Sequence, residues 1–288
     1  MDNKLVLGID IGGTNTVFGL CDYNGSISYE DSVVTKDFET PDLLVKEIHK
    51  KLSEANLIDN IIGIGIGAPN GNYFSGTIEF APNLKWKGVI PLSNLFHSVF
   101  NVPVELTNDA NAAAWGEAKF GAGKNQDHVM LLTIGTGIGG GLVVNGDLHR
   151  GAFGVAAEFG HLRVVPEGHL CGCGARGCFE QYASGNALLR HAREAIAASP
   201  ELARNLLARG DGSVNGLTGT AVTDAAREGD PVALAAFNTT AQWLGAGIAS
   251  ITGLLLSDFL KLVVIATIIG IPVAWYASSR WLQNYAYK

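Results

Sequence analysis

Three cysteines and a histidine lie close together in the middle of the sequence. Cys171, Cys173 and Cys178 fall within eight residues, and His161 precedes them by ten residues. Three thiolates and one imidazole make up the ligand set of a closed, tetrahedral zinc site, and the glycines between the cysteines allow tight turns. The alternative is a group of buried free cysteines beside a core histidine. We predict a Zn²⁺ site at these four residues, and a core position for the isolated Cys21.

Carboxylate and imidazole groups around this cluster have the chemistry of a sugar site. Glu158 and His161 are three residues apart, so both side chains can reach one point, and Glu180 follows the cysteines directly. Carboxylate, imidazole and amide groups are what a site needs in order to hold several sugar hydroxyls. A metal at the cysteines would fix the position of Glu180.

Asp109 is the candidate general base. It follows Asn108 at the carboxyl end of an apolar strand and precedes a helix expected over residues 110–119. A carboxylate in this position can face a cleft and accept the proton of an alcohol, and in phosphoryl transfer it orients the nucleophile. The alternative is a plain helix N-cap, a role that aspartate also suits. Taken alone, the position favours the cap.

Two glycine-rich loops, residues 10–15 and 135–141, each follow an apolar strand. Glycine lets backbone N–H groups turn toward a phosphate, and Asp10 could hold Mg²⁺ through water. An ordinary glycine-rich hairpin is the alternative for the first loop. Two such loops suggest that the phosphates of a nucleotide are gripped from two sides, although neither loop is a Walker P-loop or a dinucleotide fingerprint. The candidate nucleotide-binding residues are Asp10, Gly12, Gly13, Thr14, Asn15, Thr136 and Gly137.

Apolar strands must position these residues. Strands are expected over residues 5–9, 16–21, 61–66 and 102–106, with a helix opened by Pro41. Strands that alternate with helices predict an α/β fold that binds ligands at the carboxyl ends of strands. We expect an N-terminal α/β domain over residues 1–120, a second α/β domain over 121–256 with a helical end, and an atypical apolar tail over 257–288.

The composition excludes several classes of protein. The chain has 288 residues, of which 47% are apolar and 16% charged, so it is long enough for two modest globular domains. A net charge of −7 argues against a nucleic-acid partner, which needs a basic face. The apolar start is cut short by Asp10, which predicts a cytoplasmic protein without a signal peptide. In that compartment clustered cysteines favour metal over disulfides.

Together these elements resemble the ROK family of sugar kinases and related repressors, within the hexokinase/actin-like (ribonuclease H-like) ATPase superfold, which has a cleft between two domains. The resemblance covers about residues 4–250. It is carried by both glycine loops, by Asn108-Asp109-Ala-Asn111-Ala-Ala, by Glu158-x-Gly-His161 and by Cys171-x-Cys173-Gly-x-x-Gly-Cys178-x-Glu180.

The resemblance implies an enzyme that uses ATP and Mg²⁺ to phosphorylate the 6-hydroxyl of a hexose, with Asp109 as the base. Glucose is favoured over N-acetylated hexosamines, mannose or fructose. The implied sugar contacts are Asn83, Asn108, Asp109, Glu158, His161 and Glu180. His161 would also bind the zinc through its other nitrogen, and this zinc would be structural, without a part in the chemistry. A homo-oligomer, either a dimer or a tetramer, is implied as well.

Two features depart from the family pattern. The family usually has glycine after the proline that is Pro69 here, whereas this chain has Asn70 and then Gly71. After Leu256 the expected strand, glycine-rich turn and returning helix are not visible, and the tail resembles the last span of an ABC-transporter permease. All basic residues up to Lys124 are lysines and those over residues 150–227 are arginines, which favours a chain joined from different sources.

The tail has no charged residue over positions 262–277, and aromatic residues cluster near its end. A helix over residues 259–277 would be long enough to span a membrane, and Pro272 would not forbid it. The alternative is a buried C-terminal helix. We expect a foreign segment that replaces the adenosine-binding end and causes membrane association or aggregation.

Three functions compete on the sequence alone. The first is the hexose kinase, and the second is a sugar-sensing repressor of the same family, which needs a DNA-binding domain before the loop that starts at residue 10. The third is a membrane protein, or an inactive composite, with a sugar-binding body.

Overall fold

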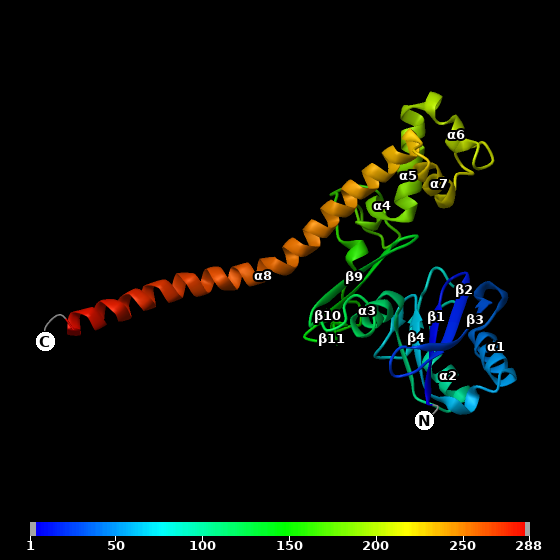
Figure 1. Cartoon of the computed structure of the whole chain (residues 1–288), viewed down its shortest axis with the longest axis horizontal. Helices are drawn as coiled ribbons and strands as arrows, with labels where there is room; N and C mark the ends of the chain where they lie inside the picture. Colours follow the sequence, from blue (N-terminus) through cyan, green and yellow to red (C-terminus); the bar gives the residue numbers. More distant parts are fainter. Residues whose placement is uncertain (1–3, 286–288) are drawn as a thin grey trace. The chain divides into compact units, whose positions relative to one another are not determined.

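The structure is a computed structural model that describes the backbone of residues 4–285. Beyond Ser257 it describes the side chains of Lys261, Thr267–Ile269, Ile271, Pro272 and Trp275. The chain forms two compact units, Met1–Gly160 and His161–Lys288, and each is described by itself (Figure 1).

A five-stranded sheet is the centre of the first unit, with the strand order β3-β2-β1-β4-β8. Its strands are β1 (Leu5–Ile11), β2 (Asn15–Cys21), β3 (Ile27–Val34), β4 (Ile61–Ala68) and β8 (Val104–Asn108). Strands β1, β4 and β8 are parallel neighbours, and β2 and β3 extend the sheet antiparallel. The parallel pairing brings the ends of β1 and β8, and therefore Asp10 and Asn108, to the same edge of the sheet.

Two helices, α1 (Pro41–Glu54) and α2 (Leu92–Phe100), contribute apolar side chains to one core with the strands. Alternate residues of β1 (Leu7, Ile9, Ile11) are buried in that core together with Leu44 and Phe96. Period-two burial of this kind is typical of a strand with one face on the core. The 3₁₀ turns η1 (Thr35–Asp37) and η2 (Ile58–Asn60) and a small sheet complete this part of the unit. The strands of the small sheet are β5 (Gly71–Asn72), β6 (Thr77–Glu79) and β7 (Val89–Ile90).

Helix α3 (Asp109–Lys119) joins this part of the unit to a second antiparallel sheet. That sheet contains β9 (Val129–Ile134), β10 (Ile138–Val144) and β11 (Asp147–Leu148). α3 contacts β4 and β8 as well as β9, β10 and β11. Helix α3 packs on both sheets, and the compact unit that contains them runs to Gly160. The domain boundary expected at residue 121 lies between the end of α3 at Lys119 and the start of β9 at Val129, and it stays a prediction.

The second unit is mostly helical. After η3 (Phe159–His161) and the cysteine-rich loops it contains α4 (Glu180–Ala183), α5 (Gly185–Ala198), η4 (Pro200–Leu202), α6 (Arg204–Leu207), α7 (Gly219–Arg227) and α8 (Pro231–Tyr285). Apolar residues of α5, α6, α7 and the start of α8 form its core. Asp230 caps the start of α8, since its Oδ1 accepts hydrogen bonds from the backbone N–H groups of Val232 and Ala233, each at 3.0 Å.

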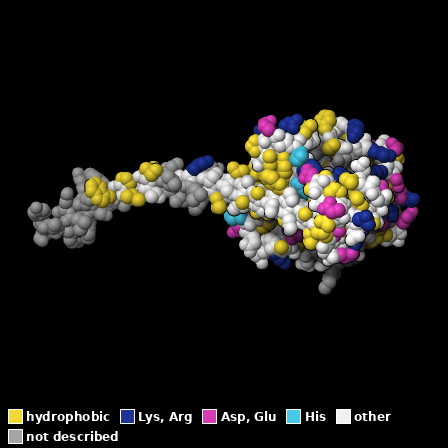
Figure 2. Space-filling view, turned by 90° about the horizontal axis from the view of Figure 1, so that it is seen from above, with side chains coloured by type: hydrophobic (Ala, Val, Ile, Leu, Met, Phe, Trp, Pro, Cys, Tyr) yellow, Lys and Arg dark blue, Asp and Glu magenta, His cyan; other side chains and the backbone are white. Residues whose placement is uncertain are grey.

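Helix α8 continues without a break into the tail. Ile251 is buried, whereas Leu254, Leu255 and Leu256 are each at least half exposed, and Figure 2 shows apolar side chains at the surface along this helix. Among the described residues, no helix is long and apolar enough to cross a membrane. The predicted span over 259–277 is therefore not confirmed, and most of its side chains lie outside the described residues.

Candidate active site

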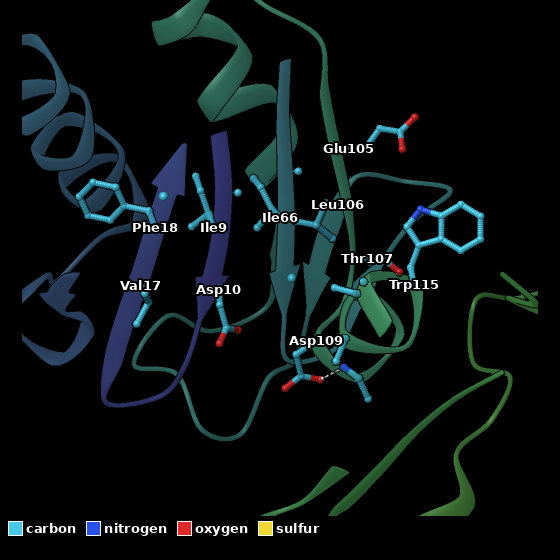
Figure 3. A pocket seen from close by; sticks show the side chains of 18 of the residues that line it. Ile9, Asp10, Val17, Phe18, Ile66, Glu105, Leu106, Thr107, Asp109 and Trp115 are labelled. Carbon is cyan, nitrogen blue, oxygen red and sulfur yellow. Dashed lines mark hydrogen bonds between the residues drawn. The ribbon is translucent and has the colours of Figure 1, made fainter. Parts of the chain in front are cut away.

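Four acidic residues line a single cavity of about 780 Å³ in the first unit, namely Asp10, Glu30, Glu105 and Asp109, and two of them, Asp10 and Asp109, are predicted site residues. Asp10 is the penultimate residue of β1, and Asp109 is the first residue of α3, directly after β8. Figure 3 shows both side chains at the same end of the strands. Burial, and then the negative charge of Asp109, raise the pKa of Asp10. Because the charged form of Asp10 is disfavoured there, a bound cation would stabilise its carboxylate. This fits the prediction that Asp10 holds Mg²⁺.

The start of α3 distinguishes the two roles considered for Asp109. The N-cap is Asn108, whose Oδ1 accepts a hydrogen bond from the N–H of Ala110 at 2.9 Å and a longer one from Asn111 at 3.4 Å. Asp109 stands one position later, where its Oδ1 also accepts from the N–H of Ala110 at 2.8 Å. The cap alternative is thus wrong for Asp109. Its carboxylate is exposed and lines the cavity.

The first glycine loop packs closely against Asn83. A Cβ atom at Gly13 would lie 2.6 Å from the backbone oxygen of Asn83, closer than real contacts allow. The loop is closed by a hydrogen bond from the N–H of Gly12 to the oxygen of Asn15 at 2.9 Å. The Thr14 oxygen accepts from the N–H of Thr35 at 2.8 Å. A side chain at position 13 would therefore force the loop away from Asn83, which is an expected sugar contact.

The second loop is shorter than predicted. Only Gly135–Gly137 form a turn between β9 and β10, with the N–H of Gly135 donating to the Gly137 oxygen at 3.0 Å. Thr136 is exposed at this turn. The prediction that the loop runs to Gly141 is wrong, because Gly139, Gly140 and Gly141 belong to β10.

The glycines of β10 allow this strand to approach helix α3. A Cβ atom at Gly139 would lie 2.9 Å from Cβ of Ala110, and one at Gly141 would lie 2.4 Å from Cβ of Ala114. Because β10 has glycine and α3 has alanine at these positions, the two backbones can approach each other closely. The helix that carries Asp109 is thereby fixed against the hairpin that carries the second loop.

The predicted zinc ligands come together in the second unit. One ligand atom from each of His161, Cys171, Cys173 and Cys178 lies within 4.8 Å of the others. Cys171 Sγ lies 3.6 Å from His161 Nδ1, and Cys173 Sγ lies 3.6 Å from Cys178 Sγ. Three sulfur atoms and one imidazole nitrogen at this spacing fit the donor set of a structural zinc site. Cys21 is only half-buried in β2 and lines the cavity, so the prediction of a core position is wrong.

The three thiols differ in acidity. Burial raises the pKa of Cys171 to about 12, and burial also raises the pKa of Cys178. The backbone N–H of Ala175 lowers the pKa of the exposed Cys173. Cys171 Sγ donates a hydrogen bond to Glu180 Oε1 at 3.0 Å, and His161 Nδ1 lies 3.9 Å from the same oxygen. Glu180 thus lies against the predicted ligands, as its place in the sequence indicates.

The expected sugar contacts are divided between the two units. Asn83, Asn108, Asp109 and Glu158 belong to the first unit, and His161 and Glu180 belong to the second. Ala157, directly before Glu158, has a φ of 64°, a left-handed conformation that is uncommon for alanine. Such strain is typical of functional sites. The family usually has glycine at the position of Asn70, and the structure explains why asparagine can replace it. Asn70 has a φ of 52°, a conformation that glycine and asparagine tolerate best.

Sequence reasoning missed two residues of the cavity, Tyr73 and Arg150. Tyr73 lies in the turn after β5, and Arg150 follows β11. The guanidinium carbon of Arg150 is 3.8 Å from the centroid of the Tyr73 ring. A signal was present in the sequence, since Arg150 is the only arginine in residues 1–160.

Comparison with known proteins gives one consistent family. The model of the ROK family matches residues 6–268, so the match continues beyond the expected end near residue 250. A glucokinase of Streptomyces coelicolor is 46% identical over 251 residues, which are 87% of this chain and 78% of that protein. A xylose repressor of Caldicellulosiruptor bescii is 33% identical and is matched over 86% of this chain and 63% of its own length.

Solved structures show the same likeness. The crystal structure of a ROK family glucokinase from Streptomyces griseus in complex with glucose and AMPPNP is 47% identical. The match covers 87% of this chain and 80% of that chain, with a TM-score of 0.74. A ROK hexokinase from Thermus thermophilus matches with a TM-score of 0.69 at 30% identity, over 88% of this chain and 78% of that chain. These likenesses confirm the predicted α/β fold of the hexokinase/actin-like ATPase class.

Proposed function

This chain belongs to the ROK family, and on that premise we propose that it is a glucokinase, which transfers the γ-phosphoryl group of ATP to the 6-hydroxyl of glucose. The observation that carries the proposal is the 47% identity to a glucokinase crystallised with glucose and AMPPNP. The cavity that contains Asp10 and Asp109 supports it, because phosphoryl transfer to an alcohol needs a base and a place for a metal ion.

In the proposed reaction, Asp109 orients the 6-hydroxyl of glucose and accepts its proton. The hydroxyl oxygen attacks the γ-phosphorus, the bond between that phosphorus and the β,γ-bridging oxygen breaks, and ADP leaves. Asp10 would hold the Mg²⁺ ion, which when bound neutralises phosphate charge. Backbone N–H groups of the two loops, at Gly12–Asn15 and Gly135–Gly137, would bind the phosphates.

The sugar is held in this proposal by Asn83, Asn108, Glu158, His161 and Glu180. His161, Cys171, Cys173 and Cys178 would hold a zinc ion, which would support two of these residues, because His161 would itself be a ligand and Glu180 contacts Cys171. Zinc in a closed four-ligand site has no open position for a substrate, so its role is structural.

A kinase is favoured over a repressor by the comparisons. The glucokinase of Streptomyces coelicolor is 46% identical, against 33% for the xylose repressor. We further propose that the protein is cytoplasmic, since the reaction uses ATP and the zinc site uses reduced thiols, which the cytoplasm maintains. A homo-oligomer is proposed from the family resemblance. Light scattering on the purified protein would distinguish a dimer from a tetramer.

A coupled assay of ADP release with a panel of hexoses tests the function. Glucose should give the highest kcat/KM, and mannose, fructose and the N-acetylated hexosamines should give lower values. ADP release that depends on no hexose in the panel would contradict the proposal. A higher kcat/KM with another hexose would support the kinase activity but contradict glucose as the preferred substrate.

A further inference from the structure

A cationic side chain, that of Arg150, lines the cavity that contains Asp10 and Asp109. Arg150 lies in the segment after β11, and the same cavity is lined by Asp10, Asp109 and Thr133 of β9. Arginine carries a planar group of N–H donors that matches the oxygens of a phosphate and stays charged at any working pH. One permanent positive charge therefore borders the space in which phosphoryl transfer is proposed to occur.

The side chain of Arg150 is held by an aromatic ring and not by an acid. Its guanidinium carbon lies 3.8 Å from the centroid of the Tyr73 ring. In the part of the chain that the structure describes, Arg150 forms no ion pair, although the four carboxylates of Asp10, Glu30, Glu105 and Asp109 line the same cavity. Its Nε is buried without a hydrogen-bond partner. A buried donor of this kind calls for an explanation, because nearly all such groups in folded proteins have a partner.

Two loops set the position of the arginine. Tyr73 is in the turn between β5 and β6, and its ring also makes an edge contact with Phe74, with centroids 5.7 Å apart. The backbone oxygen of Arg150 accepts a hydrogen bond from the N–H of Ala156 at 3.1 Å, which closes the loop that leads to Glu158. The guanidinium is thus held at a fixed place on the cavity wall, and its donors remain available to a ligand.

We propose that Arg150 donates hydrogen bonds to the phosphoryl group during transfer and stabilises the negative charge that develops there. The proposal rests on the proposed kinase function and adds one residue to its machinery. Tyr73 is then a positioning residue, since it acts only through Arg150. The alternative role for Arg150 is purely electrostatic balance, in which its charge offsets Asp10 and Asp109 without touching a ligand.

Three variants of the full chain separate these roles. Arg150→Ala should lower kcat about 100-fold, the loss typical when one transition-state donor is removed, and change the KM for glucose less than about twofold. Arg150→Lys keeps the charge but not the paired donors, so it should also lose most of the activity. Arg227→Ala, which removes an exposed arginine paired with Asp224 on α7, is the matched control and should retain activity.

Chemical rescue gives a readout that a structural role would not produce. Free guanidinium ion added to Arg150→Ala should restore a measurable part of kcat, because the face of Tyr73 remains in place to receive it. The same additive should not restore Asp109→Ala. Tyr73→Phe keeps the ring and should behave like the wild type, whereas Tyr73→Leu should lower kcat.

Each outcome bears on the proposal. Wild-type kcat in Arg150→Lys, or an Arg150→Ala variant that guanidinium cannot rescue, would overturn it in favour of charge balance. If the wild-type chain phosphorylates no hexose, the kinase function fails. Arg150 is then tested by calorimetry with MgATP, where weaker binding to Arg150→Ala supports the phosphate contact and unchanged binding overturns it.

Discussion

Cys171 Sγ donates a hydrogen bond to Glu180 Oε1 at 3.0 Å. The bond needs the thiol form of Cys171, which its pKa of about 12 maintains. A cysteine that binds zinc does so as the thiolate, because metal ligation displaces the proton. Zinc binding at Cys171 would therefore remove this donor and leave the Glu180 oxygen able to accept a hydrogen bond from a sugar hydroxyl. If both proposals hold, metal content and sugar binding would be coupled through this proton.

We expect about one Zn²⁺ per chain in protein purified without chelators, as for a single four-ligand site. Cys173→Ser should release the metal and weaken glucose binding in calorimetry, because His161 and Glu180 lose their support. Cys21→Ser is the control, since Cys21 belongs to β2 and is not one of the predicted zinc ligands, and it should keep both zinc and affinity. Protein that contains no zinc would contradict the prediction.

Asp109→Ala should lower kcat by at least roughly 100-fold, the low end for a general base, and leave glucose binding largely intact. The reason is that the exposed carboxylate lines the cavity while Asn108 supplies the helix cap. Steady-state kinetics and calorimetry with glucose provide the two measurements. Asp147→Ala, at an exposed position of β11, is a control for loss of a carboxylate. Near wild-type kcat in Asp109→Ala would remove this residue from the mechanism.

The stability of the protein should depend on pH through Asp10. Its pKa in the folded state is raised from 3.8, so its contribution is most favourable below pH 3.8 and is lost as the pH rises through the raised value. Asp10→Asn should therefore have a higher Tm than the wild type at pH 7 in magnesium-free buffer. The difference in Tm between Asp10→Asn and the wild type should become smaller as the pH falls toward 4.

Asp22 provides a control of opposite sign. Its pKa is lowered, first by the backbone N–H of Ser26, so its charge stabilises the fold above pH 3.8. Asp22→Asn should lower Tm at pH 7 by scanning calorimetry. If Asp10→Asn lowers Tm at pH 7 as well, the charge of Asp10 is not destabilising in the folded protein.

Gly13→Ala should raise the KM for glucose about tenfold, the effect of losing one hydrogen bond. The added Cβ would lie 2.6 Å from the Asn83 oxygen, so the loop or Asn83 must move. Gly63→Ala in β4 adds the same methyl group with only an ordinary contact, 3.7 Å from the Pro103 oxygen, and serves as the control. Equal KM values in the two variants would show that the contact between Gly13 and Asn83 does not position the sugar.

Deleting residues 257–288 should improve solubility and leave Tm nearly unchanged. Ile251 is buried, whereas Leu254, Leu255 and Leu256 are exposed, so the deleted segment begins after the last residue of α8 that is described as buried. Size-exclusion chromatography and scanning calorimetry are the measurements, and full kinase activity is not expected to appear. If the intact chain is monodisperse without detergent and binds ATP normally, the prediction for the tail is wrong.

Local chemistry explains why much of the site could be predicted. The predicted zinc ligands are within 18 residues of each other, and Asp10 and Asp109 each stand at the end of an apolar strand. Short spacing and strand ends limit where a side chain can lie, so His161, Cys171, Cys173 and Cys178 were found to lie together as predicted. The helix over 110–119 begins only one residue earlier, at Asp109.

Long-range packing explains what could not be predicted. Arg150 meets Tyr73 across 77 positions of the sequence, and no spacing rule connects them. Glycines 139–141 resemble a phosphate loop until their contact with α3 is known. Cys21 lies in an apolar strand, but one face of that strand lines the cavity. In each case the decisive partner is remote in sequence.

The close approach of β10 to α3 also limits how these sequences can diverge. Gly139 faces Ala110, and Gly141 faces Ala114, with no space for a methyl group on the glycine side. If either alanine is replaced by a larger residue, the glycine that faces it must be conserved. If either glycine is replaced, the facing position on the helix must become smaller than alanine. In an alignment of relatives, positions 110 and 139 should covary, as should positions 114 and 141. The helix that contains Asp109 and the hairpin that is proposed to bind the phosphates would then change by paired substitution.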